Sequence, residues 1–290
     1  MPRADVNGIE IEYETFGAPA DPALLLIMGL GGQLTAWDES ACRDLADRGL
    51  YVIRYDNRDA GLSTQFDDFP RTARLLTALL EGDFVEPPYT LSDIAADAAG
   101  LLDHLGIERA HVVGASMGGM IAQHLAFERP ERVASLVSIM STPAPHLGAP
   151  TPEARAVLFA PAAFSRDEVI EQGVAGARIT HGPVYFDEDR VRERIAAAFD
   201  RGHHPEGTAR QLVAILADGD RTERLGAITA PALVIHGAAD PLVQPEAGER
   251  TAAAIPGARL EIIPEMGHDI PVPLWPRIIG LILEHIGAAS

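Results

Sequence analysis

HVVGASMGGMIA, residues 111–122, decides the fold of this 290-residue chain. A short apolar run passes directly into Gly114-Ala115-Ser116-Met117-Gly118, which matches the pattern G-x-S-x-G, and a helical pattern follows without a break. A serine on such a sharp strand-to-helix turn takes strained backbone angles, and the two glycines remove side chains that would collide across the turn. The N–H groups at the start of the helix point toward negative charge that develops beside the serine. The stretch therefore predicts a nucleophilic Ser116 between a buried strand and a helix.

Short apolar runs without alternation recur along the chain, at residues 23–28, 51–53, 110–113, 136–139 and 232–235. Such runs are typical of strands buried on both faces, as in a parallel sheet covered by helices. Helical patterns accompany them at residues 36–48, 91–105, 117–128, 245–255 and 274–286. An Asn7-Gly8 turn before the alternating stretch 9–13 predicts a β-hairpin at the start. The sequence thus predicts an α/β fold with helices on both faces of the sheet.

Two segments interrupt this rhythm. Residues 66–89 form a long excursion, and residues 142–227 begin with a proline-rich entry and contain no convincing strand. Helices are predicted within the second segment at residues 152–160, 167–175, 188–199 and 206–217. An all-helical insert between strands is most simply a lid over one end of the sheet. We therefore predict a core made of residues 1–141 and 228–290 and a helical cap made of residues 142–227.

A serine nucleophile needs a base and a group that orients the base. Asp240 lies in the loop just after the apolar run 232–235, where an orienting carboxylate belongs, although a turn residue before Pro241 is the alternative interpretation. His268 lies in a glycine-flanked loop before the last helix and can project to the same edge of the sheet. The chain order Ser116, Asp240, His268 is that of one class of serine hydrolase.

The composition excludes several other classes of protein. All 23 cationic residues are arginine, so chemistry that needs a lysine, such as a Schiff base or a phosphate loop, is impossible. Cys42 is the single cysteine, and no H-E-x-x-H pattern occurs, so neither a disulfide nor a metal site is expected.

The charge and hydropathy patterns bear on partners and location. A formal net charge of −19 argues against nucleic acid and anionic membranes as partners and repels anionic substrates at long range, although it can equally be a device for solubility. The sequence has no pattern of a secretory signal or of a membrane-spanning segment. We therefore expect a cytoplasmic protein.

Together these motifs resemble the α/β-hydrolase family over nearly the whole chain. The resemblance rests on the G-x-S-x-G turn, DNRDAGLS at residues 56–63, GAAD at residues 237–240 and GH at residues 267–268. It implies a mostly parallel eight-stranded sheet flanked by helices, with a helical cap. LLLIMG at 24–29 and VIRYDNRD at 52–59 are most similar to aclacinomycin methylesterases and their relatives, which hydrolyse a methyl ester of an aromatic polyketide. SMGGMIAQ at 116–123 is also similar to 3-oxoadipate enol-lactonases and cofactor-free haloperoxidases.

The resemblance also implies an oxyanion hole formed by the backbone N–H groups of Leu30 and Met117. Many family members carry His-Gly after the third strand, where this chain has Met28-Gly29. The donor is a backbone group, so the hole can survive this change if the glycine-rich turn keeps its shape. An ordinary flexible turn at residues 29–32 is the alternative interpretation.

These residues predict a serine hydrolase that cleaves a carboxylic ester through an acyl-enzyme intermediate. Ser116 attacks the acyl carbonyl, His268 takes and returns the proton, and Asp240 orients the imidazole, with no cofactor required. A lactonase, a perhydrolase or a C–C bond hydrolase would use the same three residues. A non-hydrolytic ligand-binding protein of the same fold is the alternative from another class.

The predicted partner is a small-molecule ester. Phe159, Phe164, Tyr185 and Phe186 suggest an apolar tunnel for a lipophilic or aromatic acyl group, unless these rings only pack the cap onto the core. The sequence leaves open whether the protein is a monomer or a homodimer.

Overall fold

The structure, a computed structural model, describes residues 1–66, 72–83 and 85–289. Its centre is an eight-stranded sheet with the order β1-β2-β4-β3-β5-β6-β7-β8. The strands are β1 (Arg3–Val6), β2 (Ile9–Phe16), β3 (Ala23–Ile27), β4 (Tyr51–Tyr55), β5 (Ala110–Ala115), β6 (Val133–Ile139), β7 (Ala232–Gly237) and β8 (Arg259–Ile263). Only the β1–β2 and β2–β4 pairs are antiparallel, so the sheet is mostly parallel, as predicted.

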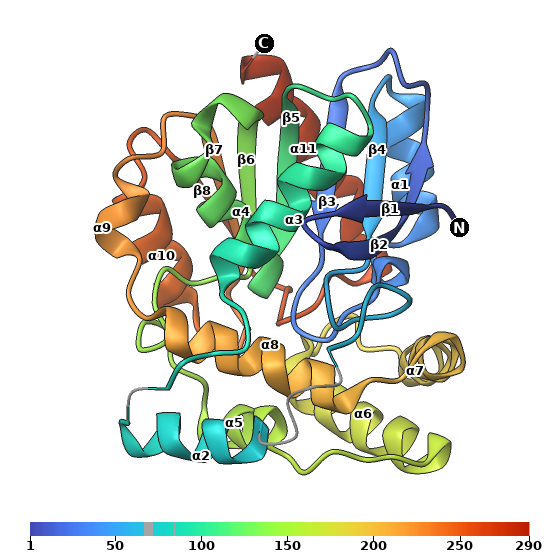
Figure 1. Cartoon of the computed structure of the whole chain (residues 1–290), viewed down its shortest axis with the longest axis vertical. Helices are drawn as coiled ribbons and strands as arrows, with labels where there is room; N and C mark the ends of the chain where they lie inside the picture. The colour runs from blue at the N-terminus through green and yellow to red at the C-terminus, as the bar shows by residue number, and fades with distance from the viewer. Residues whose placement is uncertain (67–71, 84, 290) are drawn as a thin grey trace.

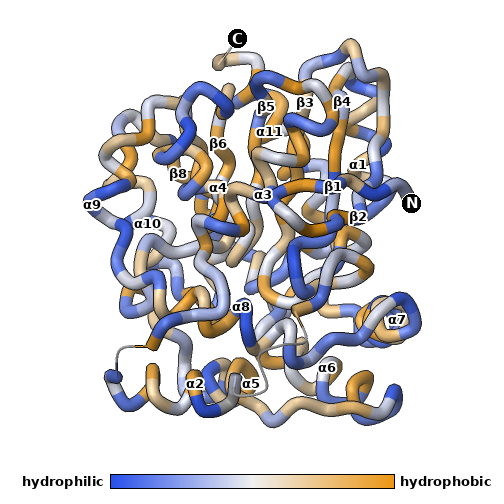
Figure 2. The backbone as a smooth tube through the Cα atoms, in the orientation of Figure 1, coloured by the Kyte–Doolittle hydropathy of each residue, from blue (hydrophilic) through white to orange (hydrophobic). Residues whose placement is uncertain are grey.

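The apolar runs of the sequence form the buried middle of this sheet. Every residue of β3, β4, β5 and β7 is buried, which gives the hydrophobic centre seen in Figure 2. Two apolar clusters cover the two faces of the sheet. The helices α3 (Leu91–His104) and α4 (Met117–Glu128) contribute to one cluster, and α1 (Glu39–Asp47) and α11 (Trp275–Ala289) to the other. Helices therefore lie on both faces, while α10 (Pro245–Ala254) packs beside β7 and β8.

The predicted hairpin is confirmed at the N-terminal end. Asn7 and Gly8 both have positive φ angles, 48° and 79°, which a tight turn between β1 and β2 requires. Along β2, exposed and buried residues alternate at the start of the strand, because only one of its faces is covered there.

The chain between β6 and β7 is helical in the part that follows residue 151. It contains α5 (Pro152–Leu158), α6 (Arg166–Thr180), α7 (Glu188–Arg201), α8 (Pro205–Asp218) and the short α9 (Thr222–Leu225). Four of these helices were predicted to within a few residues. In Figure 1, α5 to α8 gather at one end of the sheet, and we call them the inserted helices. The excursion at 66–89 also holds a helix, α2 (Thr72–Glu81), which packs against α8 and was not predicted.

Buried ion pairs join the inserted helices to the loop after β4. Arg210 on α8 donates two hydrogen bonds to the Asp59 carboxylate, at 2.8 and 2.9 Å, and both side chains are almost fully buried. Arg201 on α7 pairs with the buried Asp56 at 2.7 Å. The Tyr89 hydroxyl also donates to Asp59, at 2.7 Å. The position of the inserted helices thus depends on polar contacts that exclude water.

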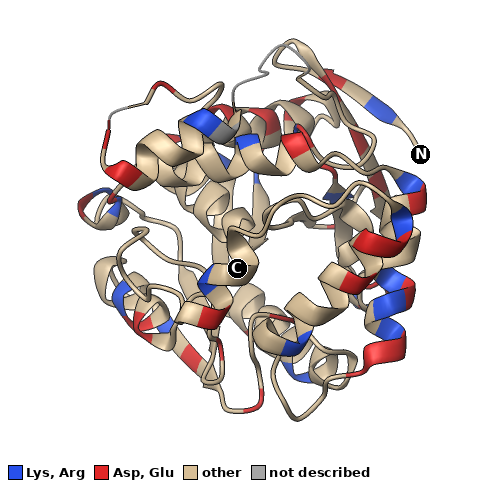
Figure 3. Ribbon diagram, turned by 90° about the horizontal axis from the view of Figure 1, so that it is seen from below, with Lys and Arg blue, Asp and Glu red and all other residues tan. Residues whose placement is uncertain are grey.

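Charged residues elsewhere lie mostly on the outer helices, where acidic and basic residues are neighbours (Figure 3). Many of these form exposed pairs, such as Arg43 with Glu39 and Arg48 with Asp44. None of the helices in the described ranges is both long and apolar enough to cross a membrane.

Replacing Arg210 by methionine should destabilise the protein strongly. The substitution leaves the Asp59 carboxylate buried without its cation, and breaking a buried pair in this way costs about 3–5 kcal/mol. The free energy of unfolding, measured by urea denaturation, should fall by roughly that amount. Arg166→Met is the matched control, because it removes an exposed pair with Asp200 at 2.8 Å, and it should change stability little. Equal losses in the two variants would contradict the anchoring role of Arg210.

Candidate active site

Ser116 occupies the sharp turn between β5 and α4. Its backbone has φ 55° and ψ −120°, a conformation that costs an L-residue roughly 1–3 kcal/mol. A Cβ atom on Gly114 would lie 2.1 Å from the carbonyl oxygen of Gly118, and one on Gly118 would lie 2.0 Å from that of Ile27. Only glycine fits at either position, as predicted. The turn is therefore held by the direct packing of its backbone against itself and against β3.

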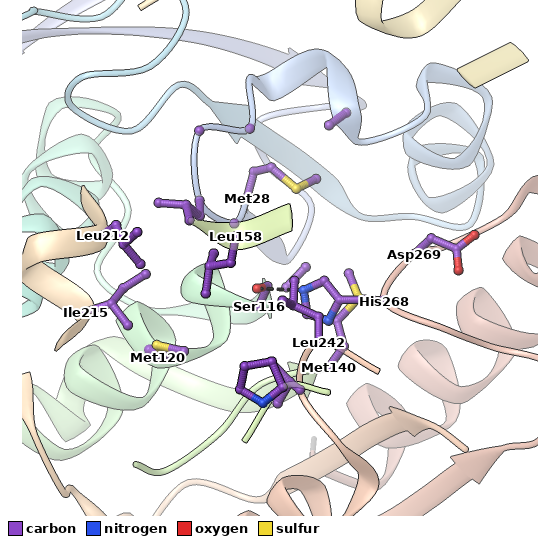
Figure 4. A pocket seen from close by; sticks show the side chains of 18 of the residues that line it. Met28, Ser116, Met120, Met140, Leu158, Leu212, Ile215, Leu242, His268 and Asp269 are labelled. Carbon is purple, nitrogen blue, oxygen red and sulfur yellow. Dashed lines mark hydrogen bonds between the residues drawn. The ribbon is translucent and has the colours of Figure 1, made fainter. Parts of the chain in front are cut away.

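Three loops bring Ser116, His268 and Asp240 together. The Ser116 hydroxyl donates to Nε2 of His268 at 3.0 Å, and Nδ1–H of His268 donates to Oδ2 of Asp240 at 2.7 Å (Figure 4 shows the first pair). These loops follow β5, β7 and β8, whose carboxyl ends meet at one edge of the parallel sheet. The geometry places a hydroxyl, an imidazole and a carboxylate in one continuous hydrogen-bonded chain.

Asp240 is fixed on both sides of its carboxylate. The group is buried, and its Oδ1 accepts hydrogen bonds at 2.9 Å from the backbone N–H groups of Leu242 and Val243. Oδ2 is left to face His268. His236, which the sequence analysis did not single out, lies behind it with Nε2 3.6 Å from Oδ2. Burial lowers the pKa of His236, so this ring is neutral near pH 7 and leaves the negative charge of Asp240 to His268.

The glycine-rich turn after β3 lies against Ser116 and is held in place. A Cβ atom on Gly29 would lie 3.0 Å from Cβ of Ser116. Nδ2 of Asn57 donates to the carbonyl of Met28 at 2.9 Å, and the N–H of Gly31 donates to Gln211 on α8 at 2.8 Å. This turn contains Leu30, while Met117 is the first residue of α4, whose N–H the helix itself cannot satisfy. The sequence alone gave no sign that Gln211 holds this turn.

A cavity of about 490 Å³ opens onto Ser116 and His268. This volume lies in the range of small-molecule sites. Its apolar wall comes mainly from aliphatic and thioether side chains, many of them labelled in Figure 4: Met28, Met120, Met140, Leu158, Leu212, Ile215 and Leu242. The inserted helices α5, α7 and α8 supply part of the wall and the sheet end supplies the rest.

Of the four aromatic residues for which the sequence left open a tunnel or simple packing, one lines the cavity and three do not. Phe159 lines the cavity. Phe164 is 68% exposed, Tyr185 packs on the core, and Phe186 packs among the inserted helices. The pattern of the sequence could not separate these roles, because each ring lies in a loop or at a helix end whose direction depends on tertiary packing.

The cavity also contains polar groups that sequence reasoning missed. Arg194, His181 and Asp269 all line it. Burial lowers the pKa of His181 to about 3, so its ring is neutral, and burial raises the pKa of Asp269. Oδ1 of Asp269 accepts the N–H of Gly182 at 2.9 Å, and the N–H of His268 donates to the carbonyl of Thr180 at 2.8 Å. The end of α6 is thereby tied to the loop of His268.

No group of three or more histidine, cysteine, aspartate or glutamate side chains in the described ranges is arranged to hold a metal ion.

Comparison with known proteins agrees with this geometry. Residues 22–272 match the family model for the alpha/beta hydrolase fold. The chain belongs to this family. Among curated α/β hydrolases, it is 31% identical to rhodomycin D methylesterase DauP of Streptomyces sp. strain C5, covering 96% of this chain and 95% of the relative. It is also 31% identical to rhodomycin D methylesterase DnrP of Streptomyces peucetius over the full length of both. The predicted resemblance to methylesterases of this family is confirmed.

Enol-lactonases are also among the similar α/β hydrolases. The chain is 30% identical to 3-oxoadipate enol-lactonase 2 of Acinetobacter baylyi, covering 88% of this chain and 85% of the relative. The enol-lactonase from Burkholderia xenovorans LB400 superimposes with a TM-score of 0.77 at 25% identity and covers 99% of this chain and all of its own.

Alanine at Gly118 should destabilise the protein, whereas alanine at Gly280 should not. The first substitution forces a methyl group against the Ile27 carbonyl, and overpacking of this kind costs about 1–3 kcal/mol or more. Gly280 lies within α11 with open space around its Cβ position, so Gly280→Ala should raise stability by up to about 1 kcal/mol. Urea denaturation measures both changes. A Gly118→Ala protein as stable as the wild type would contradict the packing that we assign to the turn.

Proposed function

We propose that this protein is a serine esterase that hydrolyses a carboxylic ester through an acyl-enzyme intermediate. The observation that carries the proposal is the hydrogen-bonded chain from Ser116 through His268 to Asp240, of which Ser116 and His268 line a largely apolar cavity. The similarity to rhodomycin D methylesterases points to the same reaction.

Each of the three side chains has a proposed role. His268 accepts the proton of the Ser116 hydroxyl as the oxygen attacks the acyl carbonyl. Asp240 keeps the Nδ1–H tautomer in place and stabilises the imidazolium that forms. His268 then gives the proton to the leaving alcohol. Water, deprotonated by the same imidazole, attacks the acyl-enzyme and releases the acid.

The proposed oxyanion hole consists of the N–H groups of Leu30 and Met117. Both belong to segments beside Ser116, and the Leu30 turn is held by Asn57 and Gln211. A donor of this kind lowers the barrier by about 3 kcal/mol, because it strengthens as negative charge develops on the carbonyl oxygen.

The proposed substrate is a lipophilic or aromatic ester, and a polyketide methyl ester is one candidate. The apolar wall of the cavity favours such groups. A second cavity of about 640 Å³, under α2, shares Leu30, Leu158, Phe159 and Leu212 with the first and offers room for a bulky substrate. We propose that residues 142–227 act as the cap that encloses the substrate, and that the protein works in the cytoplasm.

Lactone hydrolysis is the second candidate. The similarity to enol-lactonases in sequence and in structure favours it. A lactone is a cyclic ester, so Ser116 and His268 would act in the same way, but the leaving alcohol would stay attached to the acyl group. The number of products distinguishes the two candidates. A lactone gives a single hydroxy acid, whereas an open ester gives an acid and an alcohol.

Ser116→Ala should lower kcat for para-nitrophenyl butyrate by about three orders of magnitude or more, because the nucleophile is lost while the fold is kept. Ser141→Ala is the matched control. Ser141 is buried near α4, its hydroxyl has no hydrogen-bond partner among the described atoms, and it does not line the cavity. It should retain activity within about threefold of the wild type. Equal activities of the two variants would remove Ser116 from its proposed role.

For neutral para-nitrophenyl esters, kcat/KM should rise from the acetate to the hexanoate. Each buried methylene contributes up to about 0.8 kcal/mol, or roughly fourfold. Ile215→Thr should reduce this rise, because Ile215 lines the cavity, whereas Ile179→Thr should not, because Ile179 is exposed outside it. A flat or falling series in the wild type would contradict an apolar acyl site.

A further inference from the structure

Arg194 stands out among the cavity residues because nothing in the described structure neutralises it. It lies on α7 and lines the cavity together with His181 and Asp269. Arg194 is an exposed residue, and part of its surface faces the cavity. The protein around it lowers its pKa by partial desolvation. Its N–H donors are therefore open to water or to a ligand in the cavity.

Other arginines of the described chain, both buried ones and neighbours on α7, have carboxylate partners. Arg58 pairs with Asp97 at 2.6 Å, Arg210 with Asp59 at 2.8 Å and Arg201 with Asp56 at 2.7 Å. On α7 itself, Arg190 pairs with Asp38 and Arg192 with Glu171, both at 2.5 Å. Within the same described residues, Arg194 makes neither a hydrogen bond nor an ion pair.

Neither Asp269 nor His181 acts as a direct partner of Arg194. Asp269 attracts it through space but lies beyond ion-pair distance, and its oxygens face the N–H of Gly182 and, at 3.6 Å, Nδ1 of His181. His181 is neutral, so it adds no second positive charge. Arg155 also lines the cavity, but its guanidinium lies over the ring of Phe159 at 4.9 Å, so a cation–π contact holds it against that ring.

The polar residues of the cavity and its apolar end lie on opposite sides of Ser116. In Figure 4, Leu212, Ile215 and Met120 lie on one side of Ser116, and Asp269 lies on the other side, beyond His268. Arg194 interacts with Asp269 and with His181, so it belongs to this second side. A substrate held at Ser116 can therefore place an apolar group at one end and a polar group at the other.

We propose that Arg194 binds a carboxylate group that the substrate carries in addition to its scissile ester. The inference rests on the proposed esterase function and narrows the substrate class to an apolar ester acid. The planar guanidinium presents parallel N–H donors that match the two oxygens of a carboxylate. The donors of Arg194 are free in the described structure, and a carboxylate would satisfy two of them at once.

The net charge of −19 does not prevent this binding. The Debye length is about 8 Å at physiological ionic strength, so exposed carboxylates farther away act weakly on a group inside the cavity. A guanidinium in direct contact acts at about 3 Å in a partly water-excluded site, where the attraction is much stronger. The distant charges slow the approach of an anion, and the local contact decides its binding.

Two matched substrate pairs test the proposal. In the first, para-(butanoyloxy)benzoate is compared with its carboxamide, so that the charge lies on the alcohol side. In the second, the mono-para-nitrophenyl ester of glutaric acid is compared with its carboxamide, so that the charge lies on the acyl side. Arg194→Gln should lower kcat/KM for the carboxylate member of at least one pair by about 10- to 100-fold, and for its carboxamide by less than about threefold.

Arg192→Gln is the matched control, because it removes the same charge from the same helix at a position outside the cavity. Arg192→Gln should change kcat/KM for both members of each pair by the same factor. If Arg194→Gln lowers kcat/KM equally for the carboxylates and the carboxamides, or lowers it for neither, the proposal is overturned.

A binding measurement separates this proposal from the esterase function. Benzoate should raise the melting temperature of the wild type and of Ser116→Ala but not that of Arg194→Gln, and benzamide should raise none of them. This readout needs no turnover. Absence of ester hydrolysis and of fluorophosphonate labelling at Ser116 would refute the esterase function, whereas equal benzoate effects on the wild type and Arg194→Gln would refute the carboxylate site.

Discussion

The site depends on close packing of backbone against backbone, which occurs in the loops at the carboxyl ends of the parallel strands. A Cβ atom on Gly118 would lie 2.0 Å from the Ile27 carbonyl, and one on Gly237 would lie 2.1 Å from that of Met266. A Cβ atom on Gly267 would lie 2.2 Å from the nitrogen of Gly182. The loops that carry Ser116, Asp240 and His268 therefore pack more closely than any side chain allows. This closeness holds the hydroxyl, imidazole and carboxylate within hydrogen-bond reach.

The inserted helices take part in this packing. The loop of His268 contacts Gly182 just after α6. In the turn that contains Leu30, the N–H of Gly31 donates a hydrogen bond to Gln211 on α8. The ion pairs of Asp59 with Arg210 and of Asp56 with Arg201 hold α8 and α7 against the loop after β4. A displacement of these helices would thus change the cavity wall and the loops beside Ser116 together.

Charge acts on two length scales in this molecule. Acidic and basic residues are mixed over the outer helices (Figure 3), where salt and water screen them. Among the described residues, buried charges have specific neighbours: Arg210 pairs with Asp59, and Asp240 is directed at His268 by two backbone N–H groups and a neutral His236. Arg194 belongs to neither group, because it lines the cavity and makes no ion pair with another described residue.

Much of the fold followed from local patterns. Continuous apolar runs identified the buried strands, and the glycines around Ser116 identified the turn, because strand burial and a strained backbone each require particular residue types at short spacing. Asp240 and His268 could be proposed because each lies in a loop just after a strand, and the carboxyl ends of parallel strands share one edge. Helix α2 was not predicted, although its sequence TARLLTALLE is rich in strong helix formers; the structure adds that this helix packs against α8.

The cavity was decided by tertiary structure alone. The letters at Phe159 and Phe164 suggest the same role, yet only Phe159 lines the cavity, because the direction of each side chain is set by how the helices pack. Arg190, Arg192 and Arg194 likewise look equivalent along α7. Two of them meet carboxylates contributed by distant segments, and the third meets the cavity. The sequence by itself determined the residue types and loop positions of Ser116, His268 and Asp240, on which their proposed chemistry depends. Which groups surround the substrate depends on contacts between residues far apart in the chain, and only the folded structure brings those together.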